Sequence, residues 1–151
     1  MSWFPILLVV HIALAVALLA PSLLLPFLLR RAEPSGATTN PALRALMAMQ
    51  GTGSVVIAVG LAITGAALLA MLGGQLLTRP WLLVALLIYA INLAVAAFVS
   101  RPNLRRLLFP ASGTDDETWR RRARQQRYVA YAMAGATGLI GFLMSTKPQL
   151  W

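Results

Sequence analysis

Residues 3–29, WFPILLVVHIALAVALLAPSLLLPFLL, contain no Lys, Arg, Asp or Glu, and His11 is their one ionisable side chain. Crossing a hydrocarbon layer roughly 30 Å thick takes about 20 helical residues, because only a helix or a closed barrel satisfies its own backbone hydrogen bonds in lipid. Leu, Ala, Val and Ile come here in unbroken runs, without the alternation of apolar and polar residues that a barrel strand needs. This segment therefore predicts a membrane-spanning helix.

Three further segments have the same character, and they cover residues 46–72, 81–99 and 128–145. The composition agrees, since 59% of the 151 residues are hydrophobic and only 11% are charged, whereas about a quarter of a soluble domain is charged. We expect an all-α, polytopic membrane protein, a single four-helix transmembrane domain over residues 1–151. The chain has no cysteine, which excludes disulfides and thiolate metal sites.

The basic residues predict the orientation, since loops rich in Lys and Arg remain on the cytoplasmic side during insertion. Of the thirteen Lys and Arg residues, eleven lie between spans one and two (Arg30, Arg31, Arg44) or between spans three and four (Arg101, Arg105, Arg106, Arg120, Arg121, Arg122, Arg124, Arg127). Only Arg79 and Lys147 lie elsewhere. We expect two basic cytoplasmic loops and both termini outside, on the periplasmic side. No basic residue precedes the first span, which we expect to be retained as a helix and not cleaved as a signal.

The net charge of +9 raises the question of a nucleic-acid partner. A basic cytoplasmic loop is what membrane insertion requires, and the same arginines attract anionic lipid headgroups. We therefore expect the lipid bilayer as partner and no nucleic acid. The residues expected to contact anionic lipid are Arg105, Arg106, Arg120, Arg121, Arg122 and Arg124.

Two capping signals predict helices that begin before the bilayer. Asn40 followed by Pro41 is typical of an N-cap and a first helical turn. Thr114 followed three residues later by Glu117 is typical of a capping box, with acidic residues at the positive end of the helix dipole. We expect helix two to begin near residue 41 and helix four near residue 115.

Depth counting predicts one polar layer inside the bundle. His11 lies eight residues from Trp3, roughly 12 Å below the outer end of helix one at about 1.5 Å per residue. Thr64, Tyr89 and Gly138 fall at the same depth on the other helices, and Asn92 lies about one turn deeper. This layer is our candidate binding site, provided that the side chains face inward.

An ionisable residue within a span is a functional hypothesis because its burial is costly. His11 has three interpretations: a neutral imidazole hydrogen-bonded to Tyr89 or Thr64 for packing alone, an axial ligand of haem b, or a group that handles protons or contacts a quinone. A metal cage of protein ligands is disfavoured, since no second His, no Cys and no carboxylate within a span would complete it. Two His11 side chains could also meet across a homodimer.

Several short motifs resemble a known group of proteins. They are residues 7–11 (LLVVH), 79–84 (RPWLLV), 101–102 (RP) and 143–148 (LMSTKP), in a four-span chain whose N-terminus is predicted outside. In these features the whole chain resembles the uncharacterised branch of predicted bacterial integral membrane proteins in the copper-resistance-D-like superfamily. The resemblance implies a multi-pass protein of the bacterial cytoplasmic (inner) membrane, and that branch has no established activity.

A related group in the same superfamily, the four-helix membrane protoporphyrinogen oxidases, is similar in placing a histidine in helix one for haem. Those enzymes also have a lysine early in helix three, where this chain has residues 83–86, LVAL. The main hypothesis is therefore a non-catalytic accessory or structural subunit of a larger membrane complex, or a binder of haem or another lipophilic ligand. The alternative is a haem-dependent membrane oxidoreductase with His11 as axial ligand.

Overall fold

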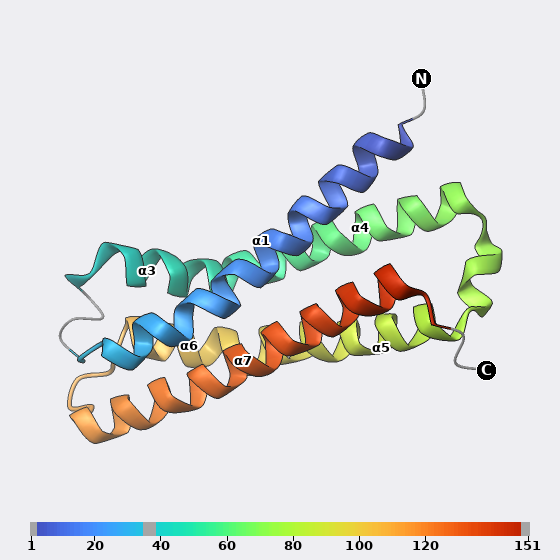
Figure 1. The fold of residues 1–151 in the computed structure, drawn as a ribbon. Coiled ribbons are helices and arrows are strands. Elements are labelled where there is room, and N and C mark those ends of the chain that lie inside the picture. Colours follow the sequence, from blue (N-terminus) through green and yellow to red (C-terminus); the bar gives the residue numbers. More distant parts are fainter. Residues whose placement is uncertain (1–2, 35–38, 149–151) are drawn as a thin grey trace.

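The computed structural model describes residues 3–34 and 39–148, and all regular structure in these residues is helical. Four helices are long and apolar enough to cross a membrane: Phe4–Arg31, Pro41–Leu72, Pro80–Leu108 and Asp116–Thr146. Both termini lie at one end of the bundle (Figure 1). We call this the terminal end, and the opposite end, where the first helix stops and the fourth begins, the basic end.

The first helix, α1 (Phe4–Arg31), is continuous although it contains Pro21 and Pro26. Both prolines are buried, as are Ser22 and Leu25 between them. This half of α1 is therefore its packed half, whereas most of the large side chains nearer the terminal end are exposed. Arg30 and Arg31 occupy its last turn, where positive charge faces the negative end of the helix dipole.

The second helix consists of α3 (Pro41–Ala48), a π-helical segment η1 (Met49–Gly53) and α4 (Ser54–Leu72). The predicted start is confirmed, because Oδ1 of Asn40 accepts hydrogen bonds from the backbone N–H groups of Ala42 (3.0 Å) and Leu43 (3.3 Å). The helix ends at Gly73, whose φ of 92° is a conformation that glycine adopts at little cost. A 3₁₀ turn, η2 (Gly74–Thr78), leads to the next helix.

The third helix consists of α5 (Pro80–Ala94), a π-helical segment η3 (Val95–Ser100) and α6 (Arg101–Leu108). The sequence predicted a basic loop after residue 99, and here the structure differs. Arg101, Arg105 and Arg106 lie on α6, which continues the helix in line with the span. A proline inside an α-helix lacks an N–H and clashes with the carbonyl four residues before it. The π-helical segment η3 ends at Ser100, two residues before Pro102.

The fourth helix, α7 (Asp116–Thr146), begins one residue after the predicted position. Its N-cap is Asp115, which accepts a hydrogen bond from the Thr118 backbone N–H at 3.3 Å. Thr114 is not the cap, because its hydroxyl donates to the Ala111 carbonyl at 2.8 Å. Hydrogen bonding from Thr118, first by its side chain and then by its backbone, lowers the pKa of the Asp115 carboxyl. The carboxylate is thereby kept charged at the positive end of α7.

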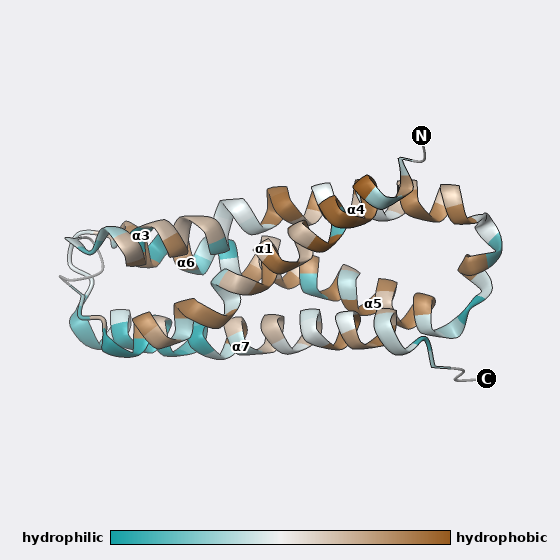
Figure 2. Ribbon diagram, turned by 45° about the horizontal axis from the view of Figure 1, so that its top comes forward, coloured by the Kyte–Doolittle hydropathy of each residue, from teal (hydrophilic) through white to brown (hydrophobic). Residues whose placement is uncertain are grey.

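The two ends of the bundle are packed differently. Within the described residues α1 packs most extensively on α7 and next on α4, and α5 packs on α7, whereas α4 and α5 do not pack extensively on each other. Towards the terminal end the α1–α4 pair diverges from the α5–α7 pair (Figure 1). Apolar residues cover the middle of the bundle and hydrophilic ones gather on the first turns of α7 (Figure 2).

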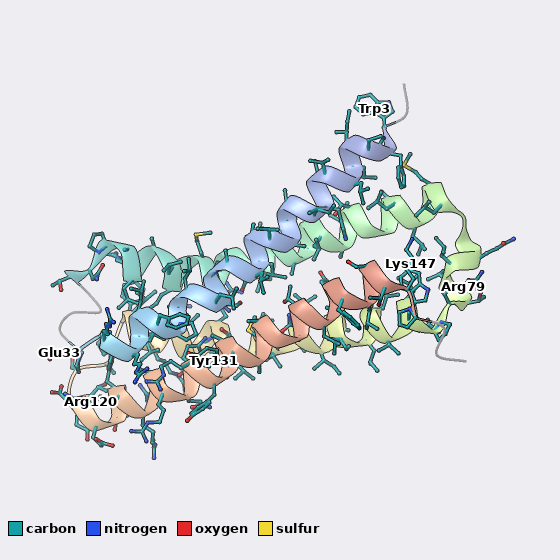
Figure 3. The ribbon with its side chains drawn as sticks, viewed as in Figure 1. Trp3, Glu33, Arg79, Arg120, Tyr131 and Lys147 are labelled. Atoms are coloured by element: carbon teal, nitrogen blue, oxygen red, sulfur yellow. The ribbon has the colours of Figure 1, made fainter. Side chains whose placement is uncertain are left out.

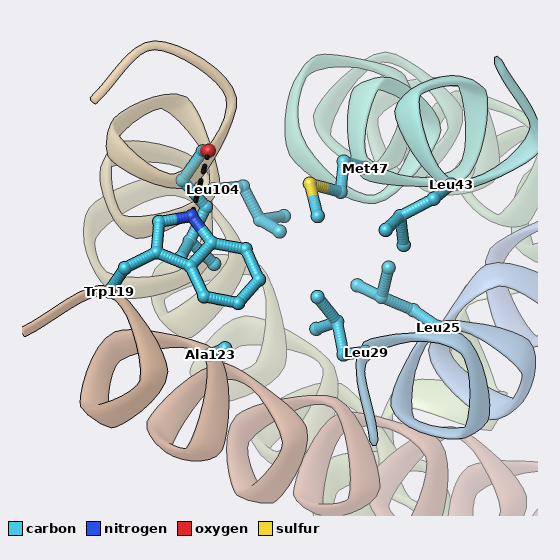
Figure 4. Packing of buried hydrophobic residues seen from close by; sticks show 8 residues of the cluster. Leu25, Leu29, Leu43, Met47, Leu104, Trp119 and Ala123 are labelled. Atoms are coloured by element: carbon cyan, nitrogen blue, oxygen red, sulfur yellow. Dashed lines mark hydrogen bonds between the residues drawn. The ribbon is translucent and has the colours of Figure 1, made fainter. Parts of the chain in front are cut away.

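At the basic end the four helices close around one core. Its buried side chains are Leu25, Leu29, Leu43, Met47, Leu104, Leu107, Trp119 and Ala123. Figure 4 shows the indole of Trp119 among leucines from the other helices, with Nε1 donating to the Leu107 carbonyl at 3.3 Å. Fully burying one of these leucines contributes about 1.5–3 kcal/mol relative to leaving it in water. This core fixes how the ends of α1 and α7 lie beside one another.

Candidate functional site

Only some residues of the predicted polar layer lie together. His11 of α1 contacts Thr64 of α4. Nδ1 of His11 lies 2.8 Å from Oγ1 of Thr64, and both side chains are half-buried. The imidazole therefore occupies a contact between two helices. This is the pairing expected if His11 faces inward.

The Thr64 hydroxyl also lies within hydrogen-bond distance of two backbone carbonyls of its own helix. Its Oγ1 lies 2.9 Å from the Gly60 carbonyl and 3.1 Å from the Leu61 carbonyl, both as a donor. A hydroxyl has one proton to donate and can accept through its lone pairs. When that proton is directed to a carbonyl, Oγ1 accepts from Nδ1–H of His11 and the lone pair of Nε2 is free; in the other tautomer Thr64 donates to Nδ1.

Gly65 provides the space for the imidazole. A Cβ atom at this position would lie 3.2 Å from Cε1 of His11 and 3.8 Å from Nδ1. The ring thus lies close against the backbone of α4.

The other predicted residues lie apart from this pair. Tyr89 donates a hydrogen bond to the Ala58 carbonyl, which is six residues from Thr64 and so about 9 Å along the helix. Asn92 is buried and donates from Nδ2 to Oγ1 of Thr137 at 3.1 Å, joining α5 to α7. Gly138 is exposed, and a Cβ there would meet nothing within 4 Å. The structure thus has three separate polar contacts where the sequence predicted one layer.

His11 offers one position for a metal or a haem. No group of three or more His, Cys, Asp or Glu side chains in the described residues could hold a metal ion. With a free lone pair on Nε2, His11 could serve as one axial ligand of a haem iron. A ligating histidine is commonly oriented by a partner on its other ring nitrogen. Thr64 would have that orienting role.

Depth counting missed two buried networks near the basic end. The side chain of Gln50 on η1 exchanges hydrogen bonds with Ser22 of α1 (3.0 and 3.1 Å) and donates to Sδ of Met133 on α7 at 3.5 Å. On α7, Gln126 donates to Oγ of Ser100 at 2.8 Å and accepts from Asn103 at 3.0 Å. Both glutamines are 0% exposed.

These networks are complete. Among the described residues no buried side-chain nitrogen or oxygen lacks a hydrogen-bond partner. A satisfied buried network stabilises one particular packing. We therefore assign Gln50 and Gln126 to the architecture. Gln50, which stands alone beside an apolar run, was a signal in the sequence, whereas Gln126 follows Gln125 within a basic run and was not.

A second site lies at the basic end, in a hollow of about 330 Å³ between the end of α1 and the start of α7. We call it the arginine hollow. Figure 3 shows Glu33 and Arg120 at this end of the molecule, opposite Arg79 and Lys147. Its charged lining residues are Arg30, Arg31, Glu33, Arg120, Arg124 and Arg127. Leu29, Trp119 and Ala123 also line it and belong to the core at the basic end, so its floor is fixed.

The positive charge of the arginine hollow is not neutralised from within. None of its arginines forms a salt bridge with another residue that the structure describes. The carboxylate of Glu33 opposes five guanidinium groups. Like charges gathered on one concave surface raise its potential and attract anions.

An apolar hollow of about 470 Å³ adjoins the arginine hollow, lined by Phe27, Leu28, Arg30 and Arg31. Arg30 and Arg31 belong to both. Phe27 is 63% exposed and lies one turn before these arginines. A cationic surface and an apolar one therefore meet at the end of α1.

The arginines predicted to contact lipid are divided by the structure. Arg120 and Arg124 line the arginine hollow, whereas Arg105, Arg106, Arg121 and Arg122 do not. Sequence reasoning missed Arg30, Arg31 and Arg127 as part of this site. The spacing of residues 120, 124 and 127, which places them on one helix face, was a usable signal for Arg127. The approach of α1 was not visible in the sequence.

The family comparison accounts for nearly the whole chain. Residues 5–148 match the model of a family described as predicted integral membrane protein (DUF2269). No curated protein matches the chain, and no solved structure matches it.

Proposed function

Because the chain belongs to the DUF2269 family of predicted integral membrane proteins, we propose that its function is exercised within the bilayer. We propose a non-catalytic protein of the bacterial inner membrane that binds an anionic lipid. The observation that carries the proposal is the arginine hollow, five guanidinium groups over a fixed floor beside an apolar surface. Basic pockets between transmembrane helices on the cytoplasmic side are suited to anionic headgroups.

In the orientation that we propose from the loop charges, this site lies at the cytoplasmic leaflet. With the basic end in the cytoplasm and both termini periplasmic, the arginine hollow faces the cytoplasmic leaflet, which carries the anionic lipids. Exposed apolar side chains of α1 extend as far as Phe27, directly before Arg30. The hollow is thereby at headgroup level, within reach of a lipid that remains in the membrane.

Lipid binding can be tested on detergent-purified protein by native mass spectrometry with phosphatidylglycerol and, separately, phosphatidylcholine. We expect phosphatidylglycerol to bind more tightly. The double variant R120Q/R124Q should weaken it roughly 30-fold, since each basic residue near a membrane surface contributes about 1 kcal/mol. The control R105Q/R106Q removes the same charge from exposed positions outside the hollow and should weaken it about threefold or less. Equal effects of the two variants would overturn the site.

A second candidate function rests on His11. With Nδ1–H bound to Thr64, its Nε2 could serve as the axial ligand of haem b, and a bound haem would supply one-electron redox chemistry. The absorption spectrum of protein purified from haem-replete cells tests this. A Soret band that disappears in His11→Ala supports it, and a colourless preparation removes it.

A further inference from the structure

We infer that the lipid selected by the arginine hollow carries two phosphate groups joined by a short linker, as cardiolipin does. The inference rests on the proposed function and names its ligand class. It comes from the amount and the spacing of charge in the hollow.

The amount of charge exceeds what one phosphate neutralises. Five arginines and one glutamate line the hollow, which leaves four positive charges uncompensated. A phosphodiester headgroup such as phosphatidylglycerol brings one negative charge, and the arginines left over would still repel one another. A headgroup with two phosphates brings twice the negative charge into the same space.

The arginines of the hollow are too far apart for one phosphate group to contact all of them. Arg120, Arg124 and Arg127 lie on one face of α7 and span about 10 Å along its axis. A guanidinium binds phosphate oxygens through short, paired hydrogen bonds, so a single phosphate engages one turn of this row. Arg30 and Arg31 face the row from the end of α1. Two linked phosphates can contact both ends of the row at once.

The adjoining apolar hollow favours an amphiphile over a free anion. Phe27 and Leu28 line it together with Arg30 and Arg31, so a ligand whose phosphates contact these arginines has its acyl chains beside α1. Exposed Leu23, Leu24 and Phe27 continue this apolar surface along the helix. Inorganic pyrophosphate has no acyl chain to lie on this surface.

The test measures binding of the full-length, detergent-purified protein by native mass spectrometry. Cardiolipin is compared with phosphatidylglycerol at twice the molar concentration, so that the phosphate is equal, and inorganic pyrophosphate is the soluble competitor. We expect cardiolipin to bind about tenfold more tightly, a difference of about 1.4 kcal/mol, and pyrophosphate not to displace it at equal concentration. Removing the ends of the row in R120Q/R127Q should abolish the preference, whereas R121Q, exposed on the same helix outside the hollow, should keep it.

The outcomes separate the two proposals. Equal binding of cardiolipin and phosphatidylglycerol at equal phosphate overturns the two-phosphate inference and leaves lipid binding standing. Binding of neither lipid overturns both proposals. Displacement of cardiolipin by an equal concentration of pyrophosphate overturns the contribution of the acyl chains. A preference that survives in R120Q/R127Q overturns the assignment to this row.

Discussion

The contact between His11, Thr64 and Gly65 shows what a single glycine contributes within a span. The imidazole fits against α4 because position 65 has no Cβ, and its Nδ1 then meets the Thr64 hydroxyl. Hydrogen bonds between membrane helices contribute about 0.6 kcal/mol on average. The value of this contact therefore lies in fixing the orientation of the ring more than in stability.

Two glycines offer a matched test of this contact. Replacing glycine by alanine inside a helix favours the folded state by up to about 1 kcal/mol. Gly138→Ala should keep this gain, since its Cβ meets nothing within 4 Å, whereas the Cβ of Gly65→Ala lies 3.2 Å from His11 and should lose most of it. Thermal unfolding in detergent measures the difference. A Gly65→Ala protein as stable as Gly138→Ala would contradict the packing.

At the scale of single residues, the sequence could predict which polar groups are present but not all of their partners. Depth counting paired His11 with Thr64 because both partners are polar side chains at one level. It could not find the partner of Tyr89, because a backbone carbonyl such as that of Ala58 has no signature in the sequence. It could not show that Gly138 lies on an exposed face of α7, since rotation about the helix axis does not follow from depth.

At the scale of the helices, each of the two π-helical segments contributes a residue to one of the buried hydrogen-bond networks. Gln50 lies on η1 and Ser100 on η3, and each takes part in one network. A π-turn changes the direction in which the following side chains point, and such segments are often found at specialised positions. Here they bring amide and hydroxyl groups into the interior where α3 meets α4 and α5 meets α6. No pattern of hydrophobicity indicated these irregular turns.

Adjacent glutamines on α7 test the importance of the Gln126 network. Gln126→Leu leaves Asn103 and Ser100 without their shared partner and should lower the free energy of unfolding by about 1–3 kcal/mol. Gln125 is exposed, and Gln125→Leu should change it by no more than about 0.5 kcal/mol. Chemical denaturation in mixed micelles gives both values. Equal losses would show that burial of Gln126 does not matter.

The sequence predicted the four long helices. It predicted where a helix begins only where a capping signal was present. The Asn40–Pro41 signal gave the start of α3 because capping is a local interaction. No cap signal in the sequence marked the end of the third helix, and the charged residues after position 99 were expected in a loop. The helix continues through Arg101 to Leu108, since its leucines at positions 104 and 107 pack into the core at the basic end.

At the scale of the whole molecule, the even number of described spans places the two termini at one end. From the loop charges we propose that the opposite end is cytoplasmic. The absence of cysteine allows single cysteines to report this. In sealed inside-out vesicles, Ser112→Cys should react with a membrane-impermeant maleimide and Gln75→Cys should not. In intact cells with a permeabilised outer membrane, the reactivities should be reversed. Labelling of Ser112→Cys from the periplasm would invert the orientation and remove the lipid proposal.

The arginine hollow is a property of the whole molecule, which is why the sequence revealed only half of it. The row on α7 follows from helical spacing, but Arg30 and Arg31 join it only through the packing of α1 on α7. That contact spans most of the chain length and depends on the closed core around Trp119.

The same contact has a consequence for biogenesis. The chain leaves the ribosome with α1 first, yet within the described helices its most extensive partner is α7, which is made last. Until translation reaches that point, the face of α1 that packs on α7 has no partner from its own chain, although Ser22 can already pair with Gln50 of the second helix. A nascent chain stopped before Asp116 would therefore hold its first helix only through the second, and should be an early substrate for membrane proteases.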